Sequence, residues 1–229
     1  MAQIADDSLG KAVLNELEVD GVDTSFLTVS EGGNSPFTYI IVDNQTKTRT
    51  CIHTAGYPPM VPDDLPESSL LSSLDGARLA YFDGRLPETA LVVAQEAARQ
   101  NIPIMEDDPE AEEMDVDSFL ESMKQSKDDS LARPTCLSSS PTKFRANGIG
   151  TVSGRLFLGT AEKIPPSEII DTTGARDAFI GAILHAICAD MPEEKMLPLA
   201  AQVAAICCRG LGARTTPQQT DPRLASFLV

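Results

Sequence analysis

The residues best suited to chemistry lie in one short segment, Asp171–Phe179, with the sequence DTTGARDAF. It is a turn of small and polar residues, which leave room for a ligand to approach backbone N–H groups, and an apolar helix is expected to follow it. The first N–H groups of a helix have no acceptor within the helix, and they attract anions. The carboxylate of Asp177, at the first turn, would accept a proton from a hydroxyl held beside it.

The same residue types have a second interpretation. An aspartate in the first turn of a helix stabilises the helix by capping it, and such a residue takes no part in chemistry. An anion-binding turn with a general base and a plain helix cap therefore both remain open on the residues alone.

The string DTTGARDAF closely resembles a signature of the ribokinase/pfkB family of carbohydrate kinases, D-T-x-G-A-G-D-A-F. The resemblance implies that Asp177 is the catalytic base, which takes the proton of the sugar hydroxyl that attacks the γ-phosphate of ATP. It also implies that the backbone of Gly174, Ala175 and Arg176 forms an anion hole for the charge on the transferring group.

The resemblance also implies the ligands. ATP would arrive with Mg²⁺, and the acceptor would be a sugar or a nucleoside-like small molecule. The resemblance to some family members implies a monovalent cation near Asp171 and Thr173, and no residue is assigned as a metal ligand. Looser similarity at the end of the chain implies further nucleotide contacts, at Thr173, Gly210, Gly212 and Ala213.

Two earlier stretches are similar to the family in order and spacing. Asp6–Thr24 resembles its D-x-x-G…GVDT segment, and Phe37–Thr54 resembles the strands of a β-lid that covers the sugar. The resemblance implies a single kinase domain over residues 1–229, with lid strands within residues 24–54. A homodimer through these strands would follow from what family members do.

The chain departs from the family in three places. Met1 begins where the family already has its first strands and its sugar-binding glycines, and Gly32-Gly33-Asn34 is misplaced to replace them. Residues 107–147 stand where the family continues into a nucleotide-binding T-x-G-x-x-G segment. Arg176 replaces a glycine, and its side chain would crowd the phosphate, or strain the backbone if φ must be positive there.

The expected fold is an incomplete ribokinase-like α/β domain, a mainly parallel sheet flanked by helices with a small β-lid. The expected activity is ATP-dependent phosphoryl transfer to a sugar hydroxyl, impaired in this chain. The alternative is a non-catalytic pseudokinase or shortened isoform that binds a nucleotide or a protein partner. A third alternative is a chain that barely folds, because missing strands would expose apolar sheet edges.

Hydrophobic periodicity predicts the elements that position the motif. Helices are expected over residues 8–18, 87–101, 177–189 and 192–209, and strands over 37–43, 47–54, 78–83, 102–106 and 150–159. Asp7 or Ser8 is the expected N-cap of the first helix. Leu91, Ala94 and Ala98 form the expected apolar stripe of the second. Strand, helix and strand between residues 78 and 106 make a βαβ unit with parallel strands.

Composition limits the partners. The chain has a net charge of −16, with eleven acidic side chains against two lysines between Glu106 and Asp129. This argues against nucleic acid, whose phosphates require basic side chains, and residues 107–147 are expected to be a disordered insert or a loop. No apolar run reaches the roughly 20 residues of a membrane span, and no signal peptide is recognised. Five cysteines without C-x-x-C spacing are expected to be buried free thiols of a cytoplasmic protein.

Overall fold

The structure is a computed structural model, and it describes residues 2–46, 48–106, 121, 123–125, 133–146 and 150–213. The chain divides into two compact units. The first comprises Met1–Ile41 and Thr50–Glu110, and the second comprises Val42–Arg49 and Ala111–Val229. None of the described helices is long and apolar enough to cross a membrane.

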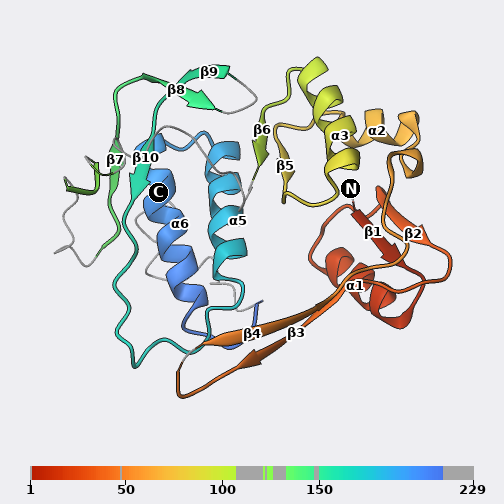
Figure 1. Ribbon diagram of the computed structural model, residues 1–229, viewed down its shortest axis with the longest axis horizontal. Coiled ribbons are helices and arrows are strands. Elements are labelled where there is room, and N and C mark those ends of the chain that lie inside the picture. Colours follow the sequence, from red (N-terminus) through yellow and green to blue (C-terminus); the bar gives the residue numbers. More distant parts are fainter. Residues whose placement is uncertain are drawn as a thin grey trace. The chain divides into compact units, whose positions relative to one another are not determined.

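The first unit combines parallel strand pairs with helices (Figure 1). Its elements, in chain order, are β1 (Ala2–Ala5), α1 (Ser8–Val19), β2 (Leu27–Ser30), β3 (Phe37–Val42), β4 (Arg49–Thr54), the 3-10 helix η1 (Pro62–Asp64), α2 (Glu67–Leu74), β5 (Ala80–Phe82), α3 (Pro87–Arg99) and β6 (Ile104–Glu106). β1 pairs with β2 and β5 with β6, in both cases in parallel. β3 and β4 pair as the predicted hairpin, whose turn belongs to the second unit.

A network of hydrogen bonds fixes the start of α1. Asp7 is its N-cap, as one of the two predicted choices: Oδ1 accepts from the Gly10 N–H at 2.6 Å and from Ser35 Oγ at 2.8 Å, and Oδ2 accepts from the Ser35 N–H at 2.9 Å. Ser35 is 1% exposed, and its hydroxyl accepts a hydrogen bond from the Ala5 N–H. These hydrogen bonds, first that from the Ser35 N–H, lower the pKa of Asp7 below its ordinary value.

We expect Asp7→Asn to lower the melting temperature at neutral pH, because its NH₂ group cannot accept from the Ser35 N–H as Oδ2 of the carboxylate does. Since folding lowers the pKa of Asp7, the carboxylate stabilises the fold above its unfolded pKa and loses that effect as the pH falls through its folded pKa. The difference between wild type and variant should therefore shrink between neutral pH and about pH 3.

Circular dichroism melts over that pH range measure this difference. The exposed Asp63 of η1 provides the control, as Asp63→Asn. A difference for Asp7→Asn that stays constant with pH would contradict the assignment.

The βαβ unit formed by β5, α3 and β6 confirms the predicted parallel pairing. Its apolar core consists of Leu70, Leu74, Ala80, Val93, Ala97 and Ile102. The predicted stripe of α3 is wrong, because Leu91 is 57% exposed and the neighbouring stripe of Thr89, Val93 and Ala97 is buried instead. Both stripes of α3 are apolar enough to be buried, and packing against the core decided between them.

The described part of the second unit contains antiparallel strand pairs and the helices α5 and α6 (Figure 1), and residues 121 and 123–125 are also helical. Its elements are β7 (Cys136–Ser138), β8 (Thr142–Ala146), β9 (Gly150–Gly154), β10 (Phe157–Gly159), α5 (Ala175–Cys188) and α6 (Glu193–Cys207). β7 pairs with β10 and β8 with β9. The helix α6 packs against α5 and also contacts β7 and β10.

Two predictions for this unit need correction. The single strand expected over residues 150–159 is interrupted at Arg155-Leu156, and its halves β9 and β10 belong to different strand pairs. Part of the expected disordered insert or loop at residues 107–147 is β-structure, since it contains β7 and β8. Residues 107–120, 122, 126–132 and 147 of that segment lie outside the described residues. Regular pairing, of β7 with β10 and of β8 with the adjacent β9, thus overrides a Ser- and Pro-rich composition.

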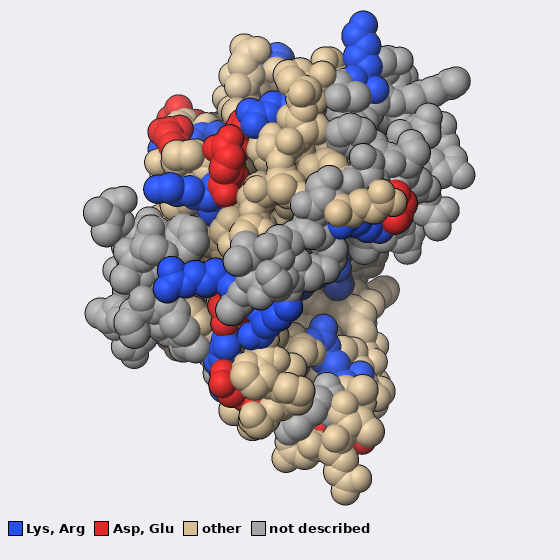
Figure 2. Space-filling model, turned by 90° about the vertical axis from the view of Figure 1, so that its left-hand side faces the viewer, with Lys and Arg blue, Asp and Glu red and all other residues tan. Residues whose placement is uncertain are grey.

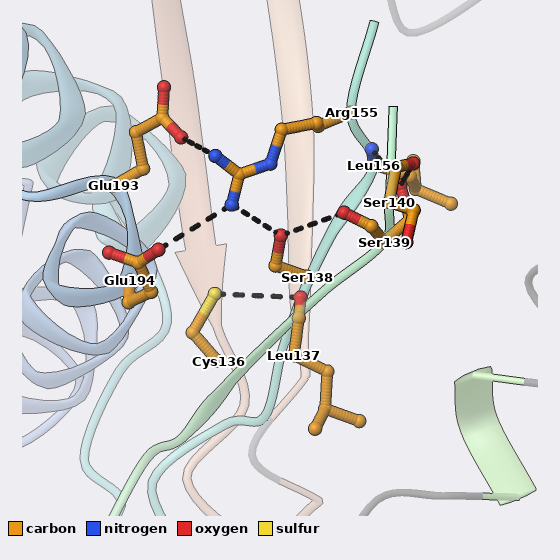
Figure 3. A network of polar contacts seen from close by, with 9 residues as sticks. All are labelled: Cys136, Leu137, Ser138, Ser139, Ser140, Arg155, Leu156, Glu193 and Glu194. Atoms are coloured by element: carbon orange, nitrogen blue, oxygen red, sulfur yellow. Dashed lines mark hydrogen bonds and ion pairs between the residues drawn. The ribbon is translucent and has the colours of Figure 1, made fainter. Parts of the chain in front are cut away.

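Arg155 ties the β7–β10 pair to the start of α6 (Figure 3). Its guanidinium donates to Glu193 and to Ser138 Oγ, each at 2.7 Å, and to Glu194 at 3.5 Å. It also lies 5.0 Å from the centre of the Phe157 ring. Acidic side chains at the first turn of a helix are favoured by its dipole, so Arg155 and the helix share these carboxylates. The contact fixes the end of α6 that lies away from the motif.

Candidate active site

The segment Asp171–Phe179 forms a turn that leads into α5, as predicted, although the helix begins at Ala175 rather than Asp177. Gly174 is the N-cap residue and has φ 77°, in the left-handed region that favours glycine. Arg176 and Asp177 follow as the second and third helical residues. Asp177 therefore lies beside the N-terminal N–H groups of the helix, which is the arrangement that an anion site with a base requires.

Gly174 also packs against the end of the described chain. A Cβ atom built on it would lie 2.5 Å from the carbonyl oxygen of Ala213 and 2.8 Å from its Cα. The residue must therefore be glycine both for its φ and for this close approach. Two predicted site residues that are 39 positions apart in the sequence are brought together here.

We expect Gly174→Ala to destabilise the protein by about 2 kcal/mol or more, because it combines left-handed strain with a clash against Ala213. Gly181→Ala is the matched control in the same helix, since a Cβ there meets nothing within 4 Å. That substitution should stabilise α5 by about 0.5–1 kcal/mol. Chemical denaturation measures both changes, and equal effects of the two variants would contradict this role of Gly174.

The carboxylate of Asp171 is the buried centre of the turn, with the residue only 4% exposed. Its Oδ1 accepts from the Thr173 N–H at 2.9 Å and from Thr173 Oγ1 at 2.7 Å, and its Oδ2 accepts from the Gly212 N–H at 3.0 Å. Burial raises the pKa of Asp171, but the hydrogen bonds from Thr173 and Gly212, with the charge of Arg49, outweigh burial and lower the pKa. Asp171 is therefore ionised at neutral pH.

Further contacts within the second unit hold this segment. The carbonyl of Cys208 accepts from the Ile170 N–H at 2.9 Å, and Cys207 Sγ donates to the Thr173 carbonyl at 3.5 Å. Arg49, the first residue of β4, donates from Nη1 to Thr172 Oγ1 at 2.8 Å. Sequence reasoning missed these roles of Arg49 and Cys207. For Arg49 the chain offers no local signal, because Thr172 is 123 residues away.

Arg176 and Asp177 both have exposed side chains. Arg176 lies in regular helix, and the described residues with positive φ other than glycine are Leu86, Asn101 and Asp190. The backbone strain considered for Arg176 is therefore not present, because the position that needs positive φ is Gly174. An exposed side chain at Asp177 is accessible to a substrate hydroxyl.

Of the four residues predicted to contact the nucleotide, three lie at the motif and one lies apart from it. Thr173 is buried and its hydroxyl donates a hydrogen bond to Asp171, so in this structure it stabilises the turn. Gly212 and Ala213 touch the motif, whereas Gly210 donates to the carbonyl of Cys207 in the turn that ends α6. A nucleotide contact of these four residues stays a prediction.

The five cysteines are free, as predicted, but the expectation that they are buried holds for Cys207 alone. Cys51 is exposed, and Cys136, Cys188 and Cys208 are half-buried. Burial raises the pKa of Cys136 and of Cys208. Within the described ranges, no group of three or more His, Cys, Asp or Glu side chains is placed to hold a metal ion.

Charge is divided unequally between the two units. The first unit has four Lys or Arg against 18 Asp or Glu, whereas the second has 14 against 16. On the face shown in Figure 2, basic side chains are interspersed with acidic ones. The acidic character of the chain thus belongs mainly to the first unit, and the unit that carries the motif is almost neutral.

Comparisons with known proteins concern the segment that carries the motif and the fold. The model of the pfkB family of carbohydrate kinases matches residues 153–221, which include the motif. No curated protein sequence matches the chain.

Similar solved structures cover nearly the whole chain. A nucleoside kinase from Burkholderia thailandensis in complex with inosine has 15% identity and a TM-score of 0.62, over 100% of this chain and 82% of that one. A ribokinase from Thermotoga maritima has 17% identity and a TM-score of 0.60, over 99% and 79%. An uncharacterized sugar kinase from Pyrococcus horikoshii in complex with ATP has 19% identity and a TM-score of 0.61, over 96% and 79%.

These likenesses confirm the predicted fold class, and the family match confirms the resemblance on the segment that carries the motif. The chain therefore has a ribokinase-like α/β fold, and its motif-bearing part matches the pfkB family of carbohydrate kinases.

Proposed function

We propose that the protein transfers the γ-phosphoryl group of ATP to a hydroxyl of a sugar or nucleoside-like small molecule. The observation that carries the proposal is the start of α5, where an exposed Asp177 lies beside the N-terminal N–H groups of the helix, in the segment that matches carbohydrate kinases. The similar structures support the choice of ligands, since one holds inosine and another holds ATP.

In the proposed reaction, the Asp177 carboxylate accepts the proton of the acceptor hydroxyl. The oxygen of that hydroxyl then bonds to the γ-phosphorus, and the bond between this phosphorus and the leaving oxygen of ADP breaks. Backbone N–H groups of Gly174, Ala175 and Arg176 stabilise the charge on the phosphoryl oxygens. The Ala175 N–H would have to leave the Thr172 carbonyl, to which it donates at 3.3 Å. Mg²⁺ would be carried by the phosphates of ATP, which supply the hard oxygen ligands that it prefers.

A monovalent cation near Asp171 and Thr173 stays a prediction, and both Asp171 oxygens already accept hydrogen bonds.

A homodimer through the β3–β4 hairpin is supported by the apolar side chains that the hairpin exposes. Tyr39, Ile41 and Ile52 are 65%, 58% and 52% exposed. Sedimentation of the full chain only at the monomer mass would contradict the dimer.

We expect Mg²⁺-ATP-dependent phosphorylation of at least one member of a panel of sugars and nucleosides. Asp177→Asn should reduce kcat by about a hundredfold to ten-thousandfold, because a general base contributes that much. Asp63→Asn is the control, since this exposed aspartate lies outside the site.

The outcomes separate the candidate functions. Turnover that survives Asp177→Asn unchanged would overturn the assignment of the base. No turnover, together with a thermal shift on addition of ATP, would favour the alternative, a non-catalytic protein that binds a nucleotide. No turnover and no thermal shift would contradict both the kinase and the non-catalytic nucleotide-binding protein.

Impaired transfer is proposed because Arg176 places a long side chain next to the anion turn. We expect Arg176→Gly to raise kcat, since it removes this crowding at a position where the backbone accepts either residue. The same variant should lower the stability of α5 by about 0.5–1 kcal/mol, because glycine is a poor helix former. Kinetics and thermal melts of the one variant check both effects. A lower kcat in the variant would show instead that the arginine assists the reaction, as a phosphate contact can.

A further inference from the structure

A buried charge in the second unit has a use that the proposed reaction does not assign. An ionised carboxylate that is nine-tenths buried is costly unless donors satisfy it, and Asp171 meets that condition with three hydrogen bonds. Hydrogen bonds to an ionised acceptor are about twice as strong as neutral ones. The carboxylate therefore holds its donors in place more firmly than a neutral side chain would.

The donors come from two parts of the chain. Thr173 supplies two of them and lies in the turn before α5, whereas Gly212 lies 41 residues after Asp171, in the turn after α6. The same two turns touch directly, because Gly174 packs on the backbone of Ala213. Oδ1 of Asp171 thus accepts hydrogen bonds from the turn before α5, and Oδ2 accepts one from the C-terminal turn.

Cys207 and Cys208, at the end of α6, make further hydrogen bonds to the turn before α5. Cys207, which is 1% exposed, donates from Sγ to the carbonyl of Thr173. The carbonyl of Cys208 accepts from the backbone N–H of Ile170 and, at 3.3 Å, from that of Asp171. The end of α6 is therefore connected to the turn before α5 by hydrogen bonds of the main chain and of a side chain, which involve Asp171 and the residues on either side of it.

We infer that Asp171 is a positioning residue, whose carboxylate locks the turn before α5 to the C-terminal turn at Gly212 and thereby sets the place of the α5 N-terminus. It contacts no reacting atom in this role, and it acts through Thr173, Gly174 and Gly212. The inference deepens the proposed function and rests on it for the kinetic consequence alone. Its structural part, the link between the two turns, stands without any activity.

The link is tested first by amide hydrogen exchange on the full chain, which needs no turnover. Asp171→Asn keeps an acceptor for Thr173 but presents an NH₂ group to the Gly212 N–H. Exchange at Gly212 should rise about 10- to 100-fold in this variant, as expected for loss of a hydrogen bond to a charged group. Asp177→Asn is the matched control and should leave exchange at Gly212 unchanged. Unchanged exchange in Asp171→Asn would overturn the link.

The kinetic consequence is tested with variants of Thr173. These variants keep the buried carboxylate of Asp171, so the test can be made even if Asp171→Asn does not fold. Thr173→Ser retains the donor to Asp171 and should behave as wild type, whereas Thr173→Val removes it. Thr173→Val should lower kcat about tenfold with little change in KM for the acceptor, because the reacting groups are displaced rather than lost. Equal kcat in the two variants would overturn the positioning role. If the wild type shows no turnover, the proposed reaction fails, while exchange at Gly212 still decides on the link.

Discussion

The second unit depends on one constraint, which is that a buried carboxylate must be surrounded by donors. Asp171 meets it with groups from both sides of the α5–α6 pair. The chain before the motif is held by Cys208, and the chain after α6 returns to place Gly212 on the same side chain. The local conformation of the motif is therefore a consequence of long-range contacts, although its sequence is short and continuous.

The first unit uses the same arrangement at the start of α1. Asp7 binds donors in its own helix and in a loop 28 residues away, as Asp171 binds Thr173 and the distant Gly212. In both places a glycine lets the backbones approach, Gly10 against Ala5 and Gly174 against Ala213. A helix start that must hold a fixed position thus combines a carboxylate with a nearby residue that lacks Cβ.

Local signals in the sequence predicted the local features of this fold. The N-cap Asp7, the βαβ unit and the helix after Gly174 follow from residue type and periodicity over a few turns. What could not be predicted depends on partners far away: the pairing of β7 with β10, the contact of Arg49 with Thr172, and the approach of Ala213. The buried face of α3 belongs to the same group, because two apolar stripes compete and the core selects one.

The unequal charge of the two units bears on how a polyanion would be attracted. With acidic side chains concentrated in the first unit and near balance in the second, the long-range field of the protein gives an incoming triphosphate no attraction. Recognition would then rely on short-range dipoles at the α5 N-terminus, whose strength mobile ions barely screen at contact distance. Added salt would raise the rate constant of association, because the salt weakens the repulsion by the acidic unit. The rate constant of dissociation would stay nearly the same.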